Sequence, residues 1–380
     1  MDRFEGADAE VRAALVVVAG HGLPGDEHRP PPAAPLDDAQ WRALVRLVQI
    51  ERLLGLLDRA VAAGALPATD EQRADAEEAA AQGLRQVLFL ERRLLAAAAA
   101  LDGAGVPFLV LKGAAVARLD EAHPSLRHYN DVDLLVRGDD VGRAVAALAA
   151  IGYGRDLPER RPGYDRRFAK EVSLADDLRT EVDLHRVLAL GAFGLAAGPA
   201  ALWSSTDRLE VGGTALAALD AEGRFAHACV NAMLGDERPR LVALRDVAVI
   251  STAHRLRPGR LGSLLPAGRG AAVAGAACAA VTALLGPGTV GAEAAAYAGS
   301  VPPSRWERAA LRAYRAHGGS NTLELLSGTM ALAGMDRLRY LQALVVPGSA
   351  YRAARREAGR PREWTTGVRE VLSRRGKSGG

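Results

Sequence analysis

Hydrophobic and polar positions follow two different periods along the chain, and the change of period marks its organisation. In residues 37–104 apolar side chains recur every three or four positions, as Trp41 and Leu44 do. This period is typical of helices packed on one face. Thr69 with Gln72 matches a capping box, which predicts the start of a longer helix. This part of the chain is therefore predicted to be helical, with Asp37 or Asp38 capping its first helix.

Residues 105–190 change to short apolar runs and to alternation with a period of two, the pattern of strands. We predict strands at 107–111, 130–136, 171–175 and 181–187, and helices at 114–120 and 141–150. The polar turn at 176–179 predicts that the last two strands form a hairpin.

The chain beyond residue 190 again has mostly helical patterns, with one more hairpin predicted at Gly212-Gly213. The predicted fold class is α+β, a small mixed sheet flanked by N- and C-terminal helical regions. The expected divisions are a helix and Pro-rich extended linker (1–36), a helical region (37–104), the sheet core (105–190), a mainly helical region (191–372) and a mobile tail (373–380).

Charge and cysteine content narrow the function classes. Lys and Arg number 48 against 45 Asp and Glu, and a net charge of +3 gives no broad surface for nucleic acid, although a local basic groove for a tRNA end stays open. The two cysteines, Cys229 and Cys278, imply no disulfide framework and fit the cytoplasm. The Ala- and Gly-rich stretch 270–292 is interrupted by Gly286-Pro287-Gly288, so no membrane span is expected.

Candidate chemistry begins in the strand at 130–136. Because strand side chains alternate faces, Asp131 and Asp133 are predicted to share one face while Val132 and Leu134 enter the core. Two adjacent carboxylates repel each other unless a cation offsets their charge, and Mg²⁺ or Mn²⁺ with an NTP suits such a pair. The same alternation also describes an ordinary half-buried strand with a solvated face.

The strand at 181–187 repeats the pattern, with Asp183 and His185 on one face. Asp183 is predicted to supply a third carboxylate, as two-metal phosphoryl transfer requires, and to accept a proton from the attacking hydroxyl. His185 is a secondary candidate, since a packed, hydrogen-bonded histidine is the commoner case.

Three further positions are candidates for nucleotide binding. Lys112-Gly113 lies where a strand turns into a helix, a place where free backbone N–H groups can meet phosphate, and Arg127 precedes the carboxylate strand. Lys112 is equally well interpreted as an exposed lysine that ends a strand. Asp246 is a secondary candidate for orienting the base, with an ordinary helix carboxylate as its alternative.

These motifs together resemble the uncharacterised nucleotidyltransferase family of the polymerase-beta-like superfamily. The resemblance rests on Phe108-Leu-Val-Leu-Lys-Gly-Ala-Ala, Leu126-Arg127, Asn130-Asp-Val-Asp-Leu-Leu-Val136 and Glu181-Val-Asp-Leu-His185. It implies Asp131, Asp133 and Asp183 as metal ligands and catalytic residues, with Lys112, Gly113 and Arg127 at the nucleotide. Two departures stand out, because Ala114 follows Gly113 where the superfamily usually has Ser, and Arg186 follows His185 where the family usually has an aromatic residue.

The resemblance implies transfer of an NMP from an NTP, expected to be ATP, to a peptide or small-molecule acceptor, with release of pyrophosphate and a role in natural-product or peptide tailoring. Arg166, Arg167 and Lys170 are either an acceptor groove or a solvated turn. A degenerate nucleotide- or peptide-binding scaffold is one alternative. A metal-dependent glycosyltransferase is another, and it requires a nucleotide-binding parallel sheet before Asp131. Oligomeric state is left open.

Overall fold

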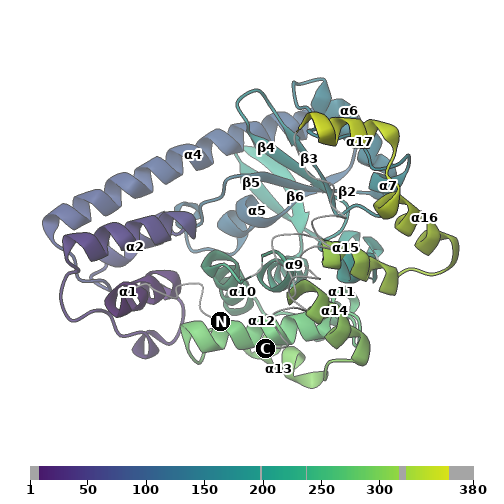
Figure 1. Cartoon of the computed structure of the whole chain (residues 1–380). Coiled ribbons are helices and arrows are strands. Elements are labelled where there is room, and N and C mark those ends of the chain that lie inside the picture. The colour runs from purple at the N-terminus through teal and green to yellow at the C-terminus, as the bar shows by residue number, and fades with distance from the viewer. Residues whose placement is uncertain (1–7, 197–198, 237, 316–321, 359–380) are drawn as a thin grey trace, which may run out of the picture.

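Six strands form one mixed sheet with helices on both of its faces (Figure 1). The structure is a computed structural model and describes residues 8–196, 199–236, 238–315 and 322–358. Helical regions precede and follow the sheet along the chain, so the predicted α+β class is confirmed. The predicted tail at 373–380 lies outside the described residues.

The strands are β1 Phe108–Val110, β2 Val132–Val136, β3 Glu171–Ala175, β4 Glu181–His185, β5 Thr206–Val211 and β6 Thr214–Leu219. The first helices are α1 Ala9–Gly20, α2 Asp38–Ile50, α3 Leu54–Ala62, α4 Asp70–Gly103, α5 Lys112–Leu119, α6 Val141–Ala149, α7 Tyr164–Arg167 and α8 Gly191–Ala196. The later helices are α9 Ala221–Leu234, α10 Leu241–Ala253, α11 Pro258–Leu264, α12 Ala271–Leu285, α13 Ala292–Ser300, α14 Arg305–Arg315, α15 Thr322–Ser327, α16 Gly334–Val345 and α17 Ser349–Glu357. Short 3-10 helices are η1 Asp26–His28, η2 Pro124–Leu126, η3 Gly138–Asp140, η4 Pro199–Trp203 and η5 Gly328–Met330.

The four strands predicted in the core are confirmed, with shifts at their ends. β3 has the predicted bounds, whereas β2 begins at Val132 and leaves Asp131 in the bend that precedes it. The hairpin of β3 and β4 is also confirmed, because the two strands pair antiparallel. The helix predicted at 114–120 begins earlier, at Lys112, directly after β1.

The strand order is β3-β4-β2-β1-β6-β5, so the sheet extends beyond residue 190, where the core was expected to end. β5 and β6 form the predicted hairpin, whose turn residues Gly212 and Gly213 have φ of 53° and 79°. Two consecutive residues with positive φ match the twist of a tight hairpin. β6 then joins the sheet by pairing parallel to β1, a long-range contact that the local pattern did not predict.

The two faces of the sheet belong to different cores. On one face, Val132, Leu134 and Val182 pack with apolar residues of α4, α5 and α6. On the other face, Leu109 and Leu135 join the core that contains α9, α10 and α12. Because side chains alternate along β2 and β4, Asp133 and Asp183 point toward this second, C-terminal group of helices.

The N-terminal helices start where the sequence predicts. Asp37 with Gln40 and Thr69 with Gln72 form capping boxes at α2 and α4. The Pro-rich segment, expected to be an extended linker, lies against the body of the protein. Arg29 is buried there and donates to the carbonyl of Leu285 at the end of α12 (2.6 Å), which ties the segment down.

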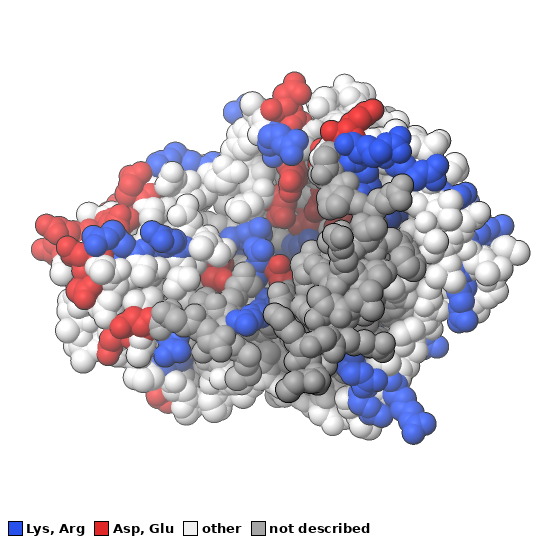
Figure 2. Space-filling view, viewed as in Figure 1, with Lys and Arg blue, Asp and Glu red and all other residues white. Residues whose placement is uncertain are grey.

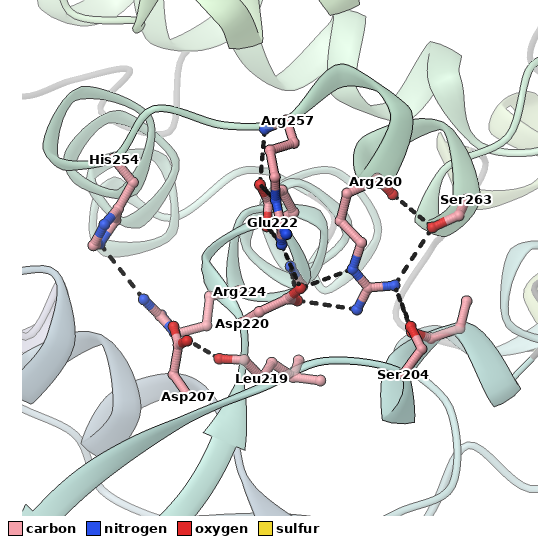
Figure 3. Close-up of polar contacts among 12 residues, drawn as sticks. Ser204, Asp207, Leu219, Asp220, Glu222, Arg224, His254, Arg257, Arg260 and Ser263 are labelled. Carbon is pink, nitrogen blue, oxygen red and sulfur yellow. Dashed lines mark hydrogen bonds and ion pairs between the residues drawn. The ribbon is translucent and has the colours of Figure 1, made fainter.

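Helix α9 belongs to the group of C-terminal helices that packs on the second face of the sheet. Ion pairs fix its start (Figure 3). Asp220 caps the helix by accepting a hydrogen bond from the N–H of Gly223, and it also accepts from Arg260. Glu222 accepts a bidentate pair from Arg257. These bonds hold α9 against the loop before α11.

No helix within the described residues is both long enough and apolar enough to cross a membrane. Cys229 and Cys278 are free and buried, so the described structure uses them as packed apolar side chains.

Candidate active site

The register of the sheet gathers acidic side chains that are far apart in the sequence. β2 and β4 run parallel, and Asp133 pairs directly with Asp183. β3 runs antiparallel to β4 and places Glu171 opposite His185. Directly opposed residues on one face are close neighbours. The pairing thus builds a cluster of three carboxylates and one histidine on the sheet face that points toward α9.

Asp133 is the centre of this cluster. Its Oδ1 accepts hydrogen bonds from Nζ of Lys112 (2.5 Å) and contacts Nε2 of His185 (2.8 Å). Both Asp133 and His185 are buried. Burial opposes ionisation, but the charges and hydrogen bonds of Lys112 and His185 outweigh it and hold the pKa of Asp133 well below its usual range. Asp133 is therefore ionised and already attracts cations.

Lys112 reaches Asp133 from a strained turn. It is the first residue of α5 and has φ of 41°, in the left-handed region that side-chain-bearing residues avoid. Burial opposes its charge, yet Asp133 and then Glu171 raise the pKa of Lys112 above its ordinary value. Strain of this kind is kept where the surrounding structure requires it, often at functional sites. Lys112 is thus held as a permanent cation at the N-terminus of α5.

Close packing explains why a glycine stands at position 113, a reason that the sequence did not suggest. A Cβ at this position would lie 2.4 Å from Cβ of Tyr129, so only glycine lets α5 pack against that side chain. The residue was predicted to allow close approach of a phosphate. In the structure, the buried side chain of Tyr129 occupies the space beside Gly113.

Asp183 is the carboxylate that lacks an ion-pair partner among the described residues. Its Oδ1 is buried and accepts no hydrogen bond from them. Burial, and then the negative charge of Glu171, raises the pKa of Asp183 to about 6. A buried acceptor without a donor costs about 1–3 kcal/mol, so the fold maintains Asp183 at the expense of stability.

Glu171 adds a carboxylate that the sequence analysis did not select. Its Oε2 lies 3.2 Å from Nε2 of His185 and 2.9 Å from Nζ of Lys170. Burial opposes its ionisation, but His185, Lys170 and Lys112 lower the pKa of Glu171 to about 2. Only the pairing of β3 with β4 brings this residue beside Asp183, and no local motif marks it.

The donor set fits a divalent cation. Ligand atoms of Asp133, Asp183 and His185 all lie within 4.8 Å of one another. The Oδ1 of Asp183 is buried and accepts no hydrogen bond from the described residues, so it is available as a ligand for such a cation. Mg²⁺ and Mn²⁺ prefer hard oxygen ligands such as carboxylates. Mn²⁺ also binds imidazole nitrogen, but less strongly than it binds carboxylate oxygen.

Asp131 lies at the edge of this cluster and outside the set of three. It sits in the bend before β2, and its Oδ1 is 3.9 Å from Nη1 of Arg52. Arg52 follows α2 and has φ of 61°, a second strained cation beside a predicted ligand. Sequence reasoning missed Arg52, because nothing in the helical pattern around it points to the sheet.

Arg127 and Asp246 contact each other. Nε and Nη2 of Arg127 donate to the two carboxylate oxygens of Asp246 at 2.7 and 2.9 Å. Both residues are buried. This bidentate pair joins the segment before β2 to the middle of α10. Arg127 and Asp246, which were predicted to bind the phosphate and the base of the nucleotide, therefore neutralise each other's charge.

His227 covers the cluster from α9. Its ring packs edge-on against that of His185, with centroids 6.0 Å apart. Burial, and then the positive charges of Lys112 and His185, holds the pKa of His227 well below its ordinary value. It therefore stays neutral beside the cationic groups. No local sequence pattern marks His227 as a site residue.

A cavity of about 320 Å³ opens beside the cluster. Lys112, Glu171 and His227 form its inner wall, and Lys170 also lines it. Arg166 and Arg167, which were predicted together with Lys170, are not among the lining residues; Arg166 pairs with Asp139 at the surface instead.

The family described as uncharacterised nucleotidyltransferase matches residues 37–257, more than half of the chain. The chain belongs to this family. It is therefore a nucleotidyltransferase, and its reaction class is the transfer of a nucleoside monophosphate from an NTP. The sheet with its carboxylates, α4, α5, α9 and α10 all fall within the matched residues.

Among solved structures, an antigenic nucleotidyltransferase-like protein from Paracoccidioides brasiliensis is similar to the chain. It is 13% identical, with a TM-score of 0.27, over 43% of this chain and 76% of that one. No curated protein matches the chain.

The glycosyltransferase alternative fails on the fold. It required a parallel nucleotide-binding sheet before Asp131, whereas only β1 precedes β2 in the described chain, and β1 pairs with it antiparallel. Membership of a nucleotidyltransferase family likewise disfavours the scaffold alternative.

Proposed function

We propose that the enzyme transfers an NMP from ATP or another NTP, in the presence of Mg²⁺ or Mn²⁺, to a peptide or small-molecule acceptor and releases pyrophosphate. One observation carries the proposal: parallel pairing sets Asp133 against Asp183, and the ligand atoms of both lie within 4.8 Å of each other and of His185. A role in peptide or natural-product tailoring fits such an acceptor.

Asp131, Asp133 and Asp183 are the proposed holders of the metal. When bound, the ion neutralises the phosphates and lowers the pKa of the acceptor hydroxyl. His185 orients Asp133 through the contact of 2.8 Å, and Arg52 positions Asp131. Asp131 and Asp133 thus each contact a cationic side chain or an imidazole ring, whereas Asp183 has no such ion-pair partner among the described residues.

Asp183 is the proposed proton acceptor. Its Oδ1 is buried and accepts no hydrogen bond from the described residues, so this oxygen is available to take a proton from the acceptor hydroxyl. The acceptor oxygen, losing its proton to Asp183, bonds to the α-phosphorus of the NTP. The bond from that phosphorus to the bridging oxygen breaks, and the electron pair leaves with pyrophosphate.

Lys112 is the proposed partner of the leaving phosphates. Its ammonium sits at the N-terminus of α5, where backbone N–H groups also favour negative charge. Because Lys112 contacts Asp133, a phosphate bound by Lys112 would lie next to a metal ion held by Asp133. Arg127 forms a buried ion pair with Asp246 and is proposed to have a structural role near the turn that begins α5, without contacting the nucleotide.

The test follows each α-labelled NTP with Mg²⁺ or Mn²⁺ and measures both labelled product and pyrophosphate, with peptide and metabolite extracts as acceptors. Wild type is compared with an Asp131→Ala/Asp133→Ala variant and with Glu181→Gln, a control at the exposed end of β4. Label must move with wild type and the control and stop in the double variant. Transfer that persists without both aspartates overturns the metal site.

A further inference from the structure

The turn between α2 and α3 holds Arg52 in a strained conformation. Its φ of 61° lies in the left-handed region, where glycine is the usual residue. Both neighbours in the chain are buried: Glu51 accepts a hydrogen bond from the N–H of Leu241 at the start of α10 (2.7 Å), and Leu53 lies in the core. Strain that persists between two such anchors indicates that the side chain is needed at this place.

The turn is also fixed against the segment that leads into β2. Gly55, near the start of α3, packs so closely on this segment that a Cβ there would collide with the carbonyl oxygen of Ser125. The same segment continues to Asp131, in the bend before β2. The start of α10 and the segment before β2 thus hold Arg52 at a defined place beside that carboxylate.

The guanidinium of Arg52 has no hydrogen-bond partner among the described residues, although its side chain is only 22% exposed. Its Nη1 lies 3.9 Å from Oδ1 of Asp131, which is beyond hydrogen-bond distance. Arg127 and Arg245, by contrast, each donate to a carboxylate at 2.7 Å. Burial lowers the pKa of Arg52 and the charge of Asp131 opposes that shift, but a guanidinium stays protonated in proteins. Its N–H groups are therefore open to an anionic ligand.

Arg52 and Lys112 reach the carboxylates of β2 from different elements. β1 pairs antiparallel with β2, and the N–H of Leu111 donates to the carbonyl of Asp133 (3.0 Å), which brings Lys112 beside the start of β2. Lys112 contacts Asp133, and Arg52 contacts Asp131, two positions earlier. Figure 2 shows basic and acidic side chains gathered near the middle of the view, to the right of α2 and below the β3–β4 hairpin.

The sheet order places the leaving phosphates on the side of Lys112. Asp183, the proposed proton acceptor, lies on β4, whereas Lys112 follows β1, and β2 runs between these two strands. The attacking and leaving oxygens lie roughly in line in phosphoryl transfer, so pyrophosphate leaves on the β1 side. Arg52 contacts Asp131, and the supports of its turn are α10 and the segment before β2 rather than β3 or β4.

Arg52 and a metal ion compete for the charge of Asp131, because two cations on one carboxylate repel each other. When the carboxylate binds the metal, the guanidinium loses its only anionic contact among the described residues. A phosphate oxygen of the incoming nucleotide replaces it, since arginine binds phosphate through paired N–H groups.

We propose that Arg52 binds the β- or γ-phosphate of the NTP and exchanges its contact with Asp131 for that phosphate when the nucleotide and its metal enter. The assignment rests on the proposed nucleotidyl transfer. It adds a phosphate-binding residue from the N-terminal helical region to Lys112 of α5. Arg52 lies within residues 37–257, which match the family.

Isothermal titration calorimetry with Mg²⁺ measures the binding of α,β-methylene ATP, which cannot release pyrophosphate, and of AMP. The variants are Arg52→Gly, which removes the charge and the backbone strain together, Arg52→Lys, and the control Arg46→Ala, at an exposed position of α2. Thermal melting checks that each is folded. Arg52→Gly should bind the ATP analogue at least about tenfold more weakly and AMP within about twofold of wild type, with Arg52→Lys between wild type and Arg52→Gly.

An Asp131→Asn background separates a direct phosphate contact from an effect through the metal. Arg52→Gly should still weaken binding of the ATP analogue when it is added to Asp131→Asn. If it causes no further loss there, Arg52 acts only by holding Asp131, and the phosphate contact is overturned.

The two proposals fail separately. Equal affinity of wild type and Arg52→Gly for the ATP analogue overturns the phosphate contact and leaves nucleotidyl transfer intact. An equal loss for the analogue and for AMP places Arg52 away from the β- and γ-phosphates and overturns it as well. Binding that changes as expected, in an enzyme that transfers label from no NTP, removes nucleotidyl transfer and keeps the phosphate contact.

Discussion

The carboxylates of the active site differ in whether neighbouring side chains compensate their negative charge. Asp133 has a lysine and a histidine as partners, whereas Asp183 is half-buried next to another carboxylate and has a buried oxygen without a donor among the described residues. Such an arrangement costs stability in the absence of a cation. Sites of this kind are kept for chemistry, because a neutral side chain would make a more stable protein.

Replacing Asp183 with Asn is expected to separate activity from stability. Turnover should fall by about 10²–10⁴-fold, the usual loss when a proton acceptor is removed. The melting temperature should stay the same or rise, because the burial of a charge beside Glu171 disappears. Glu181→Gln, on the same face of β4 but exposed, is the control for both measurements. A variant that melts several degrees lower and keeps its activity would show that Asp183 is a structural residue.

At the scale of the element, α5 is placed by close packing as much as by its charge. The helix starts at the strained Lys112 and presses Gly113 against Tyr129. Any shift of this turn moves the ammonium that touches Asp133. The geometry of the site therefore depends on the absence of a side chain at one position.

Gly113→Ala is expected to destabilise the protein by about 1–3 kcal/mol, the usual effect of forcing a methyl group into a filled space. Urea unfolding measures it. Gly142→Ala is the matched control, since Gly142 lies in α6 and a methyl group added there would meet no other atom within 4 Å. That change should be neutral or stabilising by up to about 1 kcal/mol. Equal effects of the two substitutions would contradict the packing argument.

The sequence predicted those elements whose signals are local. The helix cap at Asp37, the capping box at Thr69 and the alternation along β2 and β4 need only neighbouring residues, and they were confirmed. Glu171 and His227 come to the site through strand pairing and helix packing, which span many residues and leave no local pattern. The position of β6 beside β1 is a long-range pairing of the same kind.

At the scale of the whole molecule, buried ion pairs join the sheet to the C-terminal helices. Arg127 and Asp246 connect the segment before β2 with α10, and Asp120 at the end of α5 accepts from Arg224 of α9. Each pair spans more than a hundred residues of sequence. Such pairs fix the relative positions of elements even where they add little net stability.

The pair of Arg127 with Asp246 is expected to behave as a structural unit. Arg127→Met alone leaves a buried carboxylate without its partner and should cost about 3–5 kcal/mol of unfolding free energy. Arg127→Met/Asp246→Leu removes both charges and should recover most of that loss. Mg-ATP affinity of the double variant should stay near that of wild type. An affinity that falls about tenfold or more while stability recovers would instead place Arg127 at the nucleotide.

Stability should also depend on pH through His254. Its Nε2 contacts Asp120 at 2.7 Å, and this hydrogen bond raises the pKa of His254 above 6.5, against the effect of partial burial. A raised pKa means that the folded protein holds the proton more tightly than the unfolded chain. The stabilisation is therefore complete below pH 6.5 and is lost as the pH rises through the folded-state pKa.

Because the side chain is 31% exposed, solvent weakens the pair and the contribution should stay below about 1 kcal/mol. His254→Gln retains a donor toward Asp120 but cannot titrate, so the advantage of wild type over this variant should shrink as pH rises. Urea unfolding across the range from mildly acidic to alkaline pH measures it, with His123→Gln, an exposed histidine that contacts Ser125, as the control. An advantage that grows with pH would mean that neutral His254 is the stabilising form, and that Arg224 alone supplies the charge that holds Asp120 and the end of α5 in place.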